Sequence, residues 1–332
     1  MSNAGERMMR RSKWALNAEL LVLVLGLAAL SLSAGVHWYA PSALWTSQPQ
    51  VTSIMWQIRL PRVIAAAAVG ALLAFAGQLM QGLSRNPIAD PSILGVNAGA
   101  TLMLMLGALN GLALTIINTL WLSLLGAGIA FMCVLALAMR RGGLDVLRFI
   151  LGGTVFSSLI TCLAYAVGLL TNSTAQFRNL LVGGFTGATA SQALTASSGV
   201  IVVVIIALFA HKELSLMVLD DTTARSLGVD PSRVRLLAAL LVVICAGIAV
   251  AIAGNIGFVG LGVPQVIAYL HPDRFEKNMA PTMLGGAAFM LAVDVLAKTV
   301  TAPNELPLSA LSAICGGIFL FAILSDPRRQ RL

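Results

Sequence analysis

The chain has 332 residues, of which 58% are hydrophobic and only 10% are charged, and its mean hydropathy is +0.90. So few polar groups could not cover the surface of a water-soluble protein of this length, which excludes a soluble fold. Lys and Arg outnumber Asp and Glu by 21 to 13, but the basic residues stand singly between apolar segments. This distribution argues against a nucleic-acid partner and is typical of a membrane topology signal.

Uncharged apolar segments recur along the whole chain. Their length is close to the ~20 residues that a helix needs to cross a bilayer core of ~30 Å, and it exceeds the ~10 residues of a membrane-barrel strand. Helices are the expected spanning element, because lipid offers backbone polar groups no hydrogen-bond partner. We predict an all-α polytopic membrane protein with ten transmembrane helices, at about residues 16–36, 60–81, 92–107, 113–138, 146–169, 192–210, 233–253, 258–270, 281–300 and 308–324.

The ten spans form one domain, residues 16–324, between two short tails, residues 1–15 and 325–332. Met1–Ala4 resemble a cloning remnant, and we leave them out of the fold. The first span follows a basic cluster, as the core of a signal peptide does, but its apolar stretch is longer than such a core. We therefore interpret it as an uncleaved membrane span.

Positive charge is distributed unequally between the two sides of this domain. If the N-terminus is cytoplasmic, seventeen of the twenty-one Lys and Arg residues lie on the inner side. The exceptions are Arg59, Arg62, Arg178 and Lys298. The positive-inside rule then predicts that both termini are cytoplasmic.

Two predicted spans, 92–107 and 258–270, are short for a bilayer and are entered through Gly and Pro residues. Interrupted helices at membrane depth occur where protein or a water-filled cavity satisfies the freed backbone, so both should lie inside the bundle. Small residues four apart, such as Gly70 and Ala74, allow close helix packing.

We interpret the four cysteines as small buried hydrophobic residues rather than a metal or disulfide site; they are Cys133, Cys162, Cys245 and Cys315.

Three segments carry motifs in a fixed order. Residues 59–100 contain RLPR, a Gly- and Ala-rich helix, RNPIADP and LGVNAGA; residues 254–270 begin with GNIGFVGLGVPQ, and residues 292–298 read AVDVLAK. The pattern closely resembles the FecCD family, the permease subunits of bacterial ABC importers for ferric siderophores, haem and cobalamin, with Ile88 for Leu and Asn97 for Ser. The matching motif positions include Asn86, Pro87, Asp90, Pro91, Gly95, Gly257, Gly260 and Pro264.

The resemblance covers residues 20–327 and implies the type II ABC importer permease fold, working by alternating access in the bacterial inner membrane. It also implies a second permease subunit, two ATPase subunits and an extracytoplasmic substrate-binding protein as partners. The chain has no GxxxxGK[ST] nucleotide-binding loop, so ATP and Mg²⁺ should be bound by the separate ATPase. We expect this chain to have no enzyme activity and no cofactor of its own.

Arg59 and Arg62 stand three residues apart at the outer end of the second span, on one helical face. Arginines at helix ends commonly extend to the membrane interface, which is the simpler interpretation. The resemblance implies instead that this pair, together with Lys298, binds acidic residues of the binding protein. Lys298 stands where the family has Arg, so its contact would be less bidentate.

Asp294 lies inside the ninth span, where a carboxylate is a candidate for proton transport. Lys298 follows four residues later and offers a structural ion pair near the outer interface. We favour the ion pair, because a proton relay needs ionisable groups in several spans and we expect no second buried one. Glu305 begins an ELP sequence that matches the family's ELPxG motif in an outer loop, with Ser309 in place of Gly.

The longest cytoplasmic segment, residues 211–235, can form a compact knob of two short helices. The Asp pair at 220–221 can cap the first helix, Gly228 can end it, and Asp230 before Pro231 can start the second. An ordinary solvated loop is the alternative. The resemblance to the family's LGxxxAxxLGV connector implies a loop that couples the permease to the ATPase, through Leu219, Asp221, Thr222, Ala224, Arg225, Leu227 and Gly228.

Hydroxyl side chains recur at helical spacing along the fifth span. A hydrogen bond to the carbonyl one turn earlier is the simpler role for any one of them, but as a stripe they can line a wet path. The tenth span has a comparable face of small residues, and the resemblance implies that these two spans line the path between two permease subunits. The predicted path residues are Thr154, Ser157, Ser158, Thr161, Ser309, Ser312 and Gly316.

The chain departs from the family's GxIGFVGLxxPHxxR motif at Gln265, in place of His, and at Ala268, in place of Arg. We expect these changes to alter contacts on the cytoplasmic side. They are tolerated most easily if a different chain forms the other half of the permease, so a heterodimer is favoured over a homodimer. Among the family's cargoes a ferric siderophore is preferred, with haem and cobalamin as alternatives.

Two other classes of function predict different features. An ion-driven secondary carrier would have buried carboxylates in several spans, and an uncoupler would abolish its transport. An intramembrane hydrolase would need a nucleophile and a base within reach of each other, but His37, His211 and His271 all lie near loops. The sequence therefore favours a permease subunit over both.

Overall fold

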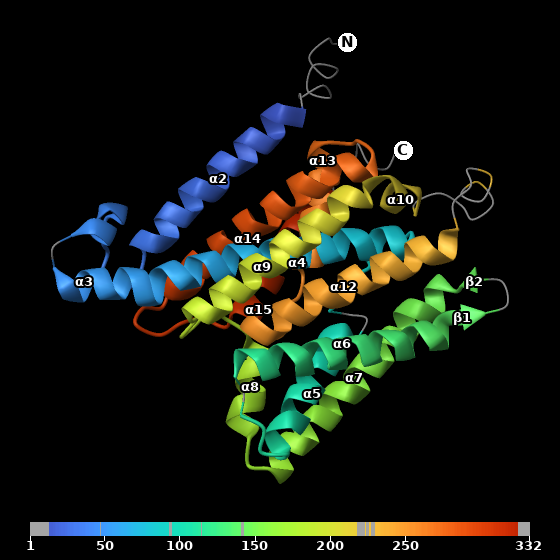
Figure 1. Ribbon diagram of the computed structural model, residues 1–332, viewed down its shortest axis with the longest axis horizontal. Coiled ribbons are helices and arrows are strands. Elements are labelled where there is room, and N and C mark those ends of the chain that lie inside the picture. The colour runs from blue at the N-terminus through green and yellow to red at the C-terminus, as the bar shows by residue number, and fades with distance from the viewer. Residues whose placement is uncertain are drawn as a thin grey trace.

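The central element of the fold is α4 (Leu60–Ser84), whose side chains are buried along almost its whole length. The computed structural model describes residues 13–324, except 47, 93–94, 114, 141–142, 218–222, 224–225 and 227–229. Within them, α4 packs mainly against α9 (Ala190–Phe209), α12 (Pro231–Ala253), α13 (Val259–Leu270) and α14 (Met279–Thr299), as Figure 1 shows. Ala and Gly make up much of α4, so neighbouring backbones can approach it closely.

The other long helices surround this centre. In the lower part of Figure 1, α5 (Val96–Leu109), α6 (Ile116–Ala138) and α7 (Val146–Leu170) pack together, and α6 and α5 contact α12. On the opposite side α2 (Lys13–Ser33) packs on α14, while α15 (Leu308–Leu324) packs on α13 and α14. Seven helices of the described chain are long and apolar enough to cross a membrane, and α5, α13 and α15 are shorter apolar helices. These helices coincide with the ten predicted spans and confirm the predicted fold class.

The helices of the bundle run roughly from left to right in Figure 1. We call the end that holds α3 (Pro49–Ile54) and the loop between α14 and α15 the outer end. The inner end holds α10 (His211–Leu216) and the two-residue strands β1 (Met139–Arg140) and β2 (Gly143–Leu144), which form a short antiparallel hairpin.

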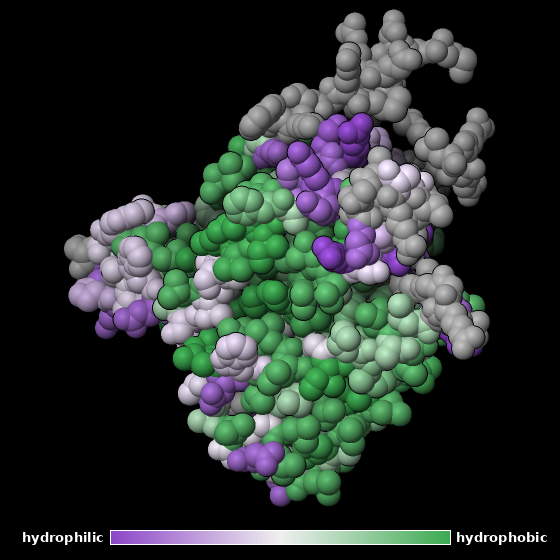
Figure 2. Space-filling view, turned by 45° about the vertical axis from the view of Figure 1, so that its right-hand side comes forward, coloured by the Kyte–Doolittle hydropathy of each residue, from purple (hydrophilic) through white to green (hydrophobic). Residues whose placement is uncertain are grey.

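Large hydrophobic side chains are exposed on α2, α6, α7 and α9. Figure 2 shows a broad hydrophobic surface over the helices, with strongly hydrophilic residues gathered toward the upper right. A surface of this kind is stable against lipid, not against water. Two cysteines, Cys133 of α6 and Cys162 of α7, are exposed on it, so the prediction that all four are buried is wrong for these two.

The outer end contains short elements that the sequence did not predict. They include η1 (Pro41–Trp45), α3 and the π-helical turn η2 (Met55–Arg59), which leads directly into α4. Pro61 explains the π turn, because it has no N–H for the Gln57 carbonyl and its ring crowds that carbonyl. After α7, the short helix α8 (Thr174–Val182) packs against α7 and α15.

Polar side chains begin several of the helices. Asp145 caps α7, and Thr189 caps α9 through a reciprocal capping box with Gln192. Asp230 accepts a hydrogen bond from the Ser232 amide at 3.0 Å and caps α12 itself. The prediction that Asp230 starts a separate short helix is therefore wrong: the chain continues from there as one membrane span.

Glycines set the closest helix contacts. Gly70 of α4 lies against Gly286 of α14, and Ala74 contacts the same glycine, as the spacing predicts. Gly77 of α4 lies against Gly260 of α13, where a Cβ atom on Gly77 would come within 1.9 Å of the Gly260 carbonyl oxygen. Backbone packs on backbone here, which holds α13 against the middle of the bundle.

Candidate functional site

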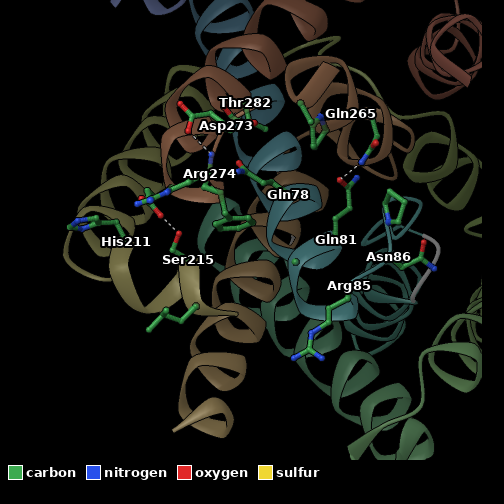
Figure 3. A pocket seen from close by; sticks show the side chains of 18 of the residues that line it. Gln78, Gln81, Arg85, Asn86, His211, Ser215, Gln265, Asp273, Arg274 and Thr282 are labelled. Carbon is green, nitrogen blue, oxygen red and sulfur yellow. Dashed lines mark hydrogen bonds between the residues drawn. The ribbon is translucent and has the colours of Figure 1, made fainter. Parts of the chain in front are cut away.

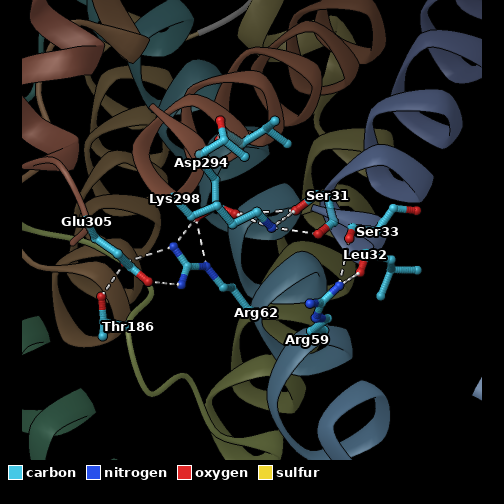
Figure 4. A network of polar contacts seen from close by, with 11 residues as sticks. Ser31, Leu32, Ser33, Arg59, Arg62, Thr186, Asp294, Lys298 and Glu305 are labelled. Atoms are coloured by element: carbon cyan, nitrogen blue, oxygen red, sulfur yellow. Dashed lines mark hydrogen bonds and ion pairs between the residues drawn. The ribbon is translucent and has the colours of Figure 1, made fainter. Parts of the chain in front are cut away.

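Four ionisable side chains meet at the outer end of the bundle (Figure 4). They are Arg62 of α4, Asp294 and Lys298 of α14, and Glu305 in the loop before α15, and we call them the outer polar cluster. The Asp294 side chain is fully buried, whereas Glu305 keeps 32% of its side chain exposed. The cluster therefore has a buried inner carboxylate and an accessible outer one.

Arg62 joins these two carboxylates. Its Nη1 and Nη2 atoms donate to Glu305 at 2.6 and 3.0 Å, and its Nε atom donates to Asp294 at 3.0 Å. A bidentate contact of this kind is the strong geometry for Arg with a carboxylate. Only 12% of the Arg62 side chain is exposed, so its contacts are mainly with its own chain.

Lys298 ties α14 to α2. Its Nζ atom donates to the backbone oxygen and the hydroxyl of Ser31 at 2.6 and 2.8 Å. It also lies 3.4 Å from Asp294, so the predicted ion pair is present. Arg62 lies closer to Asp294 than Lys298 does, at 2.9 Å. The residue spacing within α14 cannot predict this contact, because Arg62 belongs to α4. Asp294 thus has two cationic partners.

Arg59 sits in the π turn and closes the C-terminal end of α2. Its Nη1 atom donates to the carbonyls of Leu32 and Ser33 at 2.7 and 2.8 Å, and Nη2 donates to the His37 carbonyl at 2.5 Å. The guanidinium also lies 4.9 Å from the centre of the Tyr39 ring. A positive charge is favoured at a helix C-terminus, where carbonyls are unpaired. Docking by the three basic residues stays a prediction, and all three already have partners within the chain.

Glu305 receives a further hydrogen bond from Thr186, whose hydroxyl donates to Oε2 at 2.6 Å. Partial burial raises the pKa of Glu305, but the hydrogen bonds from Arg62 and Thr186 outweigh it and hold the pKa below its ordinary value of 4.5. The carboxylate is therefore charged over the whole neutral and mildly acidic range.

We expect the Glu305→Gln variant to be less stable than the wild type at neutral pH. In acid the difference in stability should be much smaller. Because the pKa of Glu305 is depressed in the folded protein, its charge stabilises the fold fully above pH 4.5 and loses this effect as the pH falls through the folded pKa. Thermal melting of both proteins in detergent, from about pH 7 to about pH 3.5, measures this. A difference in Tm that stays constant over the range would contradict the prediction.

Motif residues shape the loop between α4 and α5. Arg85, with φ of 50°, ends α4, and Asn86 accepts a hydrogen bond from the Ile88 amide at 3.0 Å in a local turn. Gly95 begins α5 with φ of 83°, a left-handed conformation in which glycine is favoured. These motif positions are thus explained by backbone geometry.

Asp90 is a second buried carboxylate, with 3% of the residue exposed. Burial raises its pKa, while hydrogen bonds from the Ser92 hydroxyl and amide favour the charged form. The expectation of a single buried carboxylate is therefore wrong. Its partners lie in its own loop and at the start of α13, and none of the described residues links it to the outer polar cluster. The two carboxylates do not form a relay within the described chain.

One backbone hydrogen bond is missing at the start of α13. Pro264 lies inside α13 and has no N–H to donate to the carbonyl of Gly260, four residues earlier. Gln81 of α4 replaces this donor: its Nε2 atom lies 3.1 Å from the Gly260 oxygen and 3.3 Å from the Leu261 oxygen. Gln265 in turn donates to Gln81 Oε1 at 2.8 Å. Gln265, which departs from the family motif, thus positions Gln81, and Gln81 supplies the hydrogen bond that the Gly260 carbonyl lacks.

A cavity of about 1030 Å³ opens at the inner end (Figure 3). Gln78 and Gln81 of α4, Gln265 of α13 and Arg274 line it, and so does Ala268, where the family's Arg would occupy part of the space. Helix α10 forms another wall and is tied to η3 (Phe275–Asn278) by a hydrogen bond from Ser215 to Glu276.

All seven predicted coupling residues lie outside the described part of the chain. These are Leu219, Asp221, Thr222, Ala224, Arg225, Leu227 and Gly228. The described beginning of the segment is α10, a short helix that starts earlier than either helix predicted for the knob. The coupling role stays a prediction.

The hydroxyl stripe of α7 lines an open depression of about 450 Å³, formed by Thr154, Ser157, Ser158, Thr161 and Cys162. Its hydroxyls also bond carbonyls of their own helix, such as Ser158 to Thr154 at 2.9 Å and Thr161 to Ser157 at 2.8 Å. On α15, Ser312 is fully buried, and Gly316 lies against Phe258. These two do not line an open surface of the single chain, because α15 packs on the start of α13.

Comparison with known proteins decides the family. The sequence matches the FecCD transport family over residues 21–326. The chain belongs to this family. It is 35% identical over 325 residues to the hemin transport system permease protein HmuU of Yersinia pestis, with 94% of each chain covered. It is 33% identical over 319 residues to the iron(3+)-hydroxamate import system permease protein FhuB of Bacillus subtilis, covering 94% of this chain and 83% of the relative.

A solved structure supports the same assignment. It is described as an inward-facing conformation of a metal-chelate type ABC transporter, and it matches this FecCD family member with a TM-score of 0.82 at 28% identity. The match covers 93% of this chain and 98% of that one. The predicted resemblance and the predicted permease fold are both confirmed.

Sequence reasoning missed several residues that complete the sites of this FecCD family member. The sequence motif identifies Glu305 but does not predict its contact with Arg62. No sequence pattern indicates a role for Ser31 or Thr186. The need for a donor such as Gln81 was predictable. A Pro inside a helix leaves the carbonyl four residues earlier without its usual N–H donor, so another group must supply one.

Proposed function

We propose that this FecCD family member is the transmembrane permease subunit of an ATP-driven importer for an iron chelate. The observation that carries the proposal is the family match over nearly the whole chain. HmuU is named for hemin and FhuB for an iron(3+)-hydroxamate, so an iron complex is common to both relatives. A ferric siderophore is the first candidate, and haem and cobalamin are the alternatives.

The proposed partners are two ATPase subunits that bind ATP and Mg²⁺, an extracytoplasmic binding protein and a second permease subunit, with a heterodimer favoured. ATP and the loaded binding protein can drive transport only if each interacts differently with the inward-open and outward-open states. The segment 211–235 would transmit the motion of the ATPase. The α7 depression would face the second permease subunit and form half of the substrate path.

The protein would lie in the bacterial inner membrane with both termini in the cytoplasm. The excess of Lys and Arg at the inner end supports this orientation. The outer polar cluster would then face the binding protein.

Uptake measurements test the function. The purified chain alone should hydrolyse no ATP, whereas vesicles holding the chain with its ATPase, second permease subunit and binding protein should take up radiolabelled ferric hydroxamate when ATP is supplied. Hemin and cobalamin serve as competing cargoes and identify the substrate class. Uptake that needs no ATPase subunit and is abolished by an uncoupler would instead establish an ion-driven carrier.

Charge reversal tests the docking surface. We expect Arg62→Glu or Arg59→Glu to weaken binding of the binding protein by about tenfold or more, because each replaces attraction to an acidic partner with repulsion. Arg178→Glu is the matched control, since Arg178 is an exposed basic residue of α8 at the outer end. Affinity is measured by surface plasmon resonance on the monodisperse, folded fraction of each variant. Equal affinities for all four proteins would refute docking at these residues.

A further inference from the structure

We propose that Glu305 holds Arg62 in place of a carboxylate of the partner, and that the binding protein must displace Glu305 when it docks. This inference rests on the proposed function, because it assumes an acidic partner at the outer end. It assigns to Glu305 the role of an internal competitor, and to the outer polar cluster the role of a latch that docking opens.

The two carboxylates that hold Arg62 are not equivalent. Asp294 is fully buried and is fixed by Lys298 and by the Ser31 hydroxyl as well as by Arg62. Glu305 lies in a loop, keeps 32% of its side chain exposed, and is held by Arg62 and Thr186. Of the two, Glu305 is therefore the carboxylate that an incoming group can replace (Figure 4).

The hydrogen-bonding capacity of Arg62 makes displacement necessary. A guanidinium has five N–H groups. The Nε atom donates to Asp294, Nη1 and Nη2 donate to Glu305, and Nη2 also lies 2.9 Å from Asp294. A second bidentate carboxylate cannot be added while Glu305 stays. Exchange also conserves charge, since Arg62 and Lys298 would again face two carboxylates.

Release of Glu305 would reach other helices. Glu305 connects α4 to the loop before α15, and through Thr186 to the segment before α9. The next residue, Leu306, donates its amide to the Ala297 carbonyl of α14 at 2.9 Å, so the loop stays attached to α14 after the exchange. Docking would therefore break the side-chain links from α4 to the loop before α15 and from that loop to the segment before α9, while the loop stays attached to α14.

The test measures the affinity of the binding protein for the complete permease–ATPase complex in nanodiscs. Glu305→Gln removes the competing charge and keeps the side-chain shape, so we expect binding to become about threefold to tenfold tighter. Asn304→Lys is the control. It adds the same single positive charge to an exposed neighbour but leaves the contact between Arg62 and Glu305 in place.

The outcomes separate this inference from the docking proposal. Tighter binding in Glu305→Gln, with little change in Asn304→Lys, supports the exchange. If Arg62→Glu weakens binding but Glu305→Gln leaves it unchanged or weaker, docking stands and the exchange is overturned. Equal tightening in Glu305→Gln and Asn304→Lys also overturns it, because long-range attraction would then explain the gain. If Arg62→Glu has no effect, the exchange is overturned, and if Arg59→Glu has none either, docking fails as well.

A second variant keeps the test decisive if Glu305→Gln does not assemble. Thr186→Val removes the hydrogen bond to Glu305 without changing the charge, so Glu305 competes less well for Arg62. We expect about twofold tighter binding. Unchanged affinity in this variant would overturn the exchange.

Discussion

Replacing Gly77 with Ala should destabilise the protein by about 3 kcal/mol or more, a large effect for a single methyl group. The new Cβ atom would lie 1.9 Å from the Gly260 oxygen and 2.3 Å from the Gly260 Cα atom. Both are backbone atoms, so no side-chain rotation relieves the clash and α4 must move away from α13. Thermal melting and the yield of monodisperse protein in detergent measure the loss.

Gly26→Ala is the matched control for this substitution. Gly26 lies inside α2, and a Cβ atom there would have no atom within 4 Å. Ala favours a helix over Gly by about 1 kcal/mol, so this variant should be unchanged or slightly more stable. Equal melting temperatures for Gly77→Ala and wild type would show that the two backbones are not in close contact.

Asp294→Asn should cost about 3 to 5 kcal/mol, which is the typical effect of breaking a buried ion pair. The change leaves Lys298 and Arg62 close together with Glu305 as the remaining carboxylate of the cluster. A second change, Lys298→Met, removes the excess charge and should recover part of the stability. Chemical unfolding of the single and double variants measures both effects.

Asp273→Asn provides the comparison. Asp273 also pairs with a Lys four residues later, Lys277, but this pair is partly exposed at the inner end, and its loss should cost less than about 1 kcal/mol. If Asp294→Asn folds as stably as Asp273→Asn, the structural role of Asp294 is refuted.

The fold was largely predictable because lipid leaves few choices. Each spanning helix must be apolar over about 20 residues, and that length is visible in the sequence. The helix α8 escaped detection because its nine residues include Gln176, Arg178 and Asn179, and so indicate an exposed loop. Its place in the bundle depends on a hydrogen bond from the Asn255 amide to the Leu180 carbonyl, which joins distant parts of the chain.

The candidate site was predictable only in its local part. The pairing of Asp294 with Lys298 follows from helical spacing, and the structure contains it. The pairing of Arg62 with Glu305 joins residues 243 positions apart, and no periodicity connects them. The same limit applies to Thr186. The basic residues could be identified as special because positive charge is scarce at the outer end, but their partners emerged only from packing.

The contact between Gln81 and Gly260 has a mechanical consequence. In the interior of an ordinary helix each carbonyl accepts a hydrogen bond from an amide of the same helix. Where Pro264 has removed that bond, a side chain of another helix supplies it, so the broken turn of α13 is paired only while α4 lies beside it. Moving α13 away from α4 would therefore leave a main-chain carbonyl unpaired inside the bundle, and this couples the positions of the two helices.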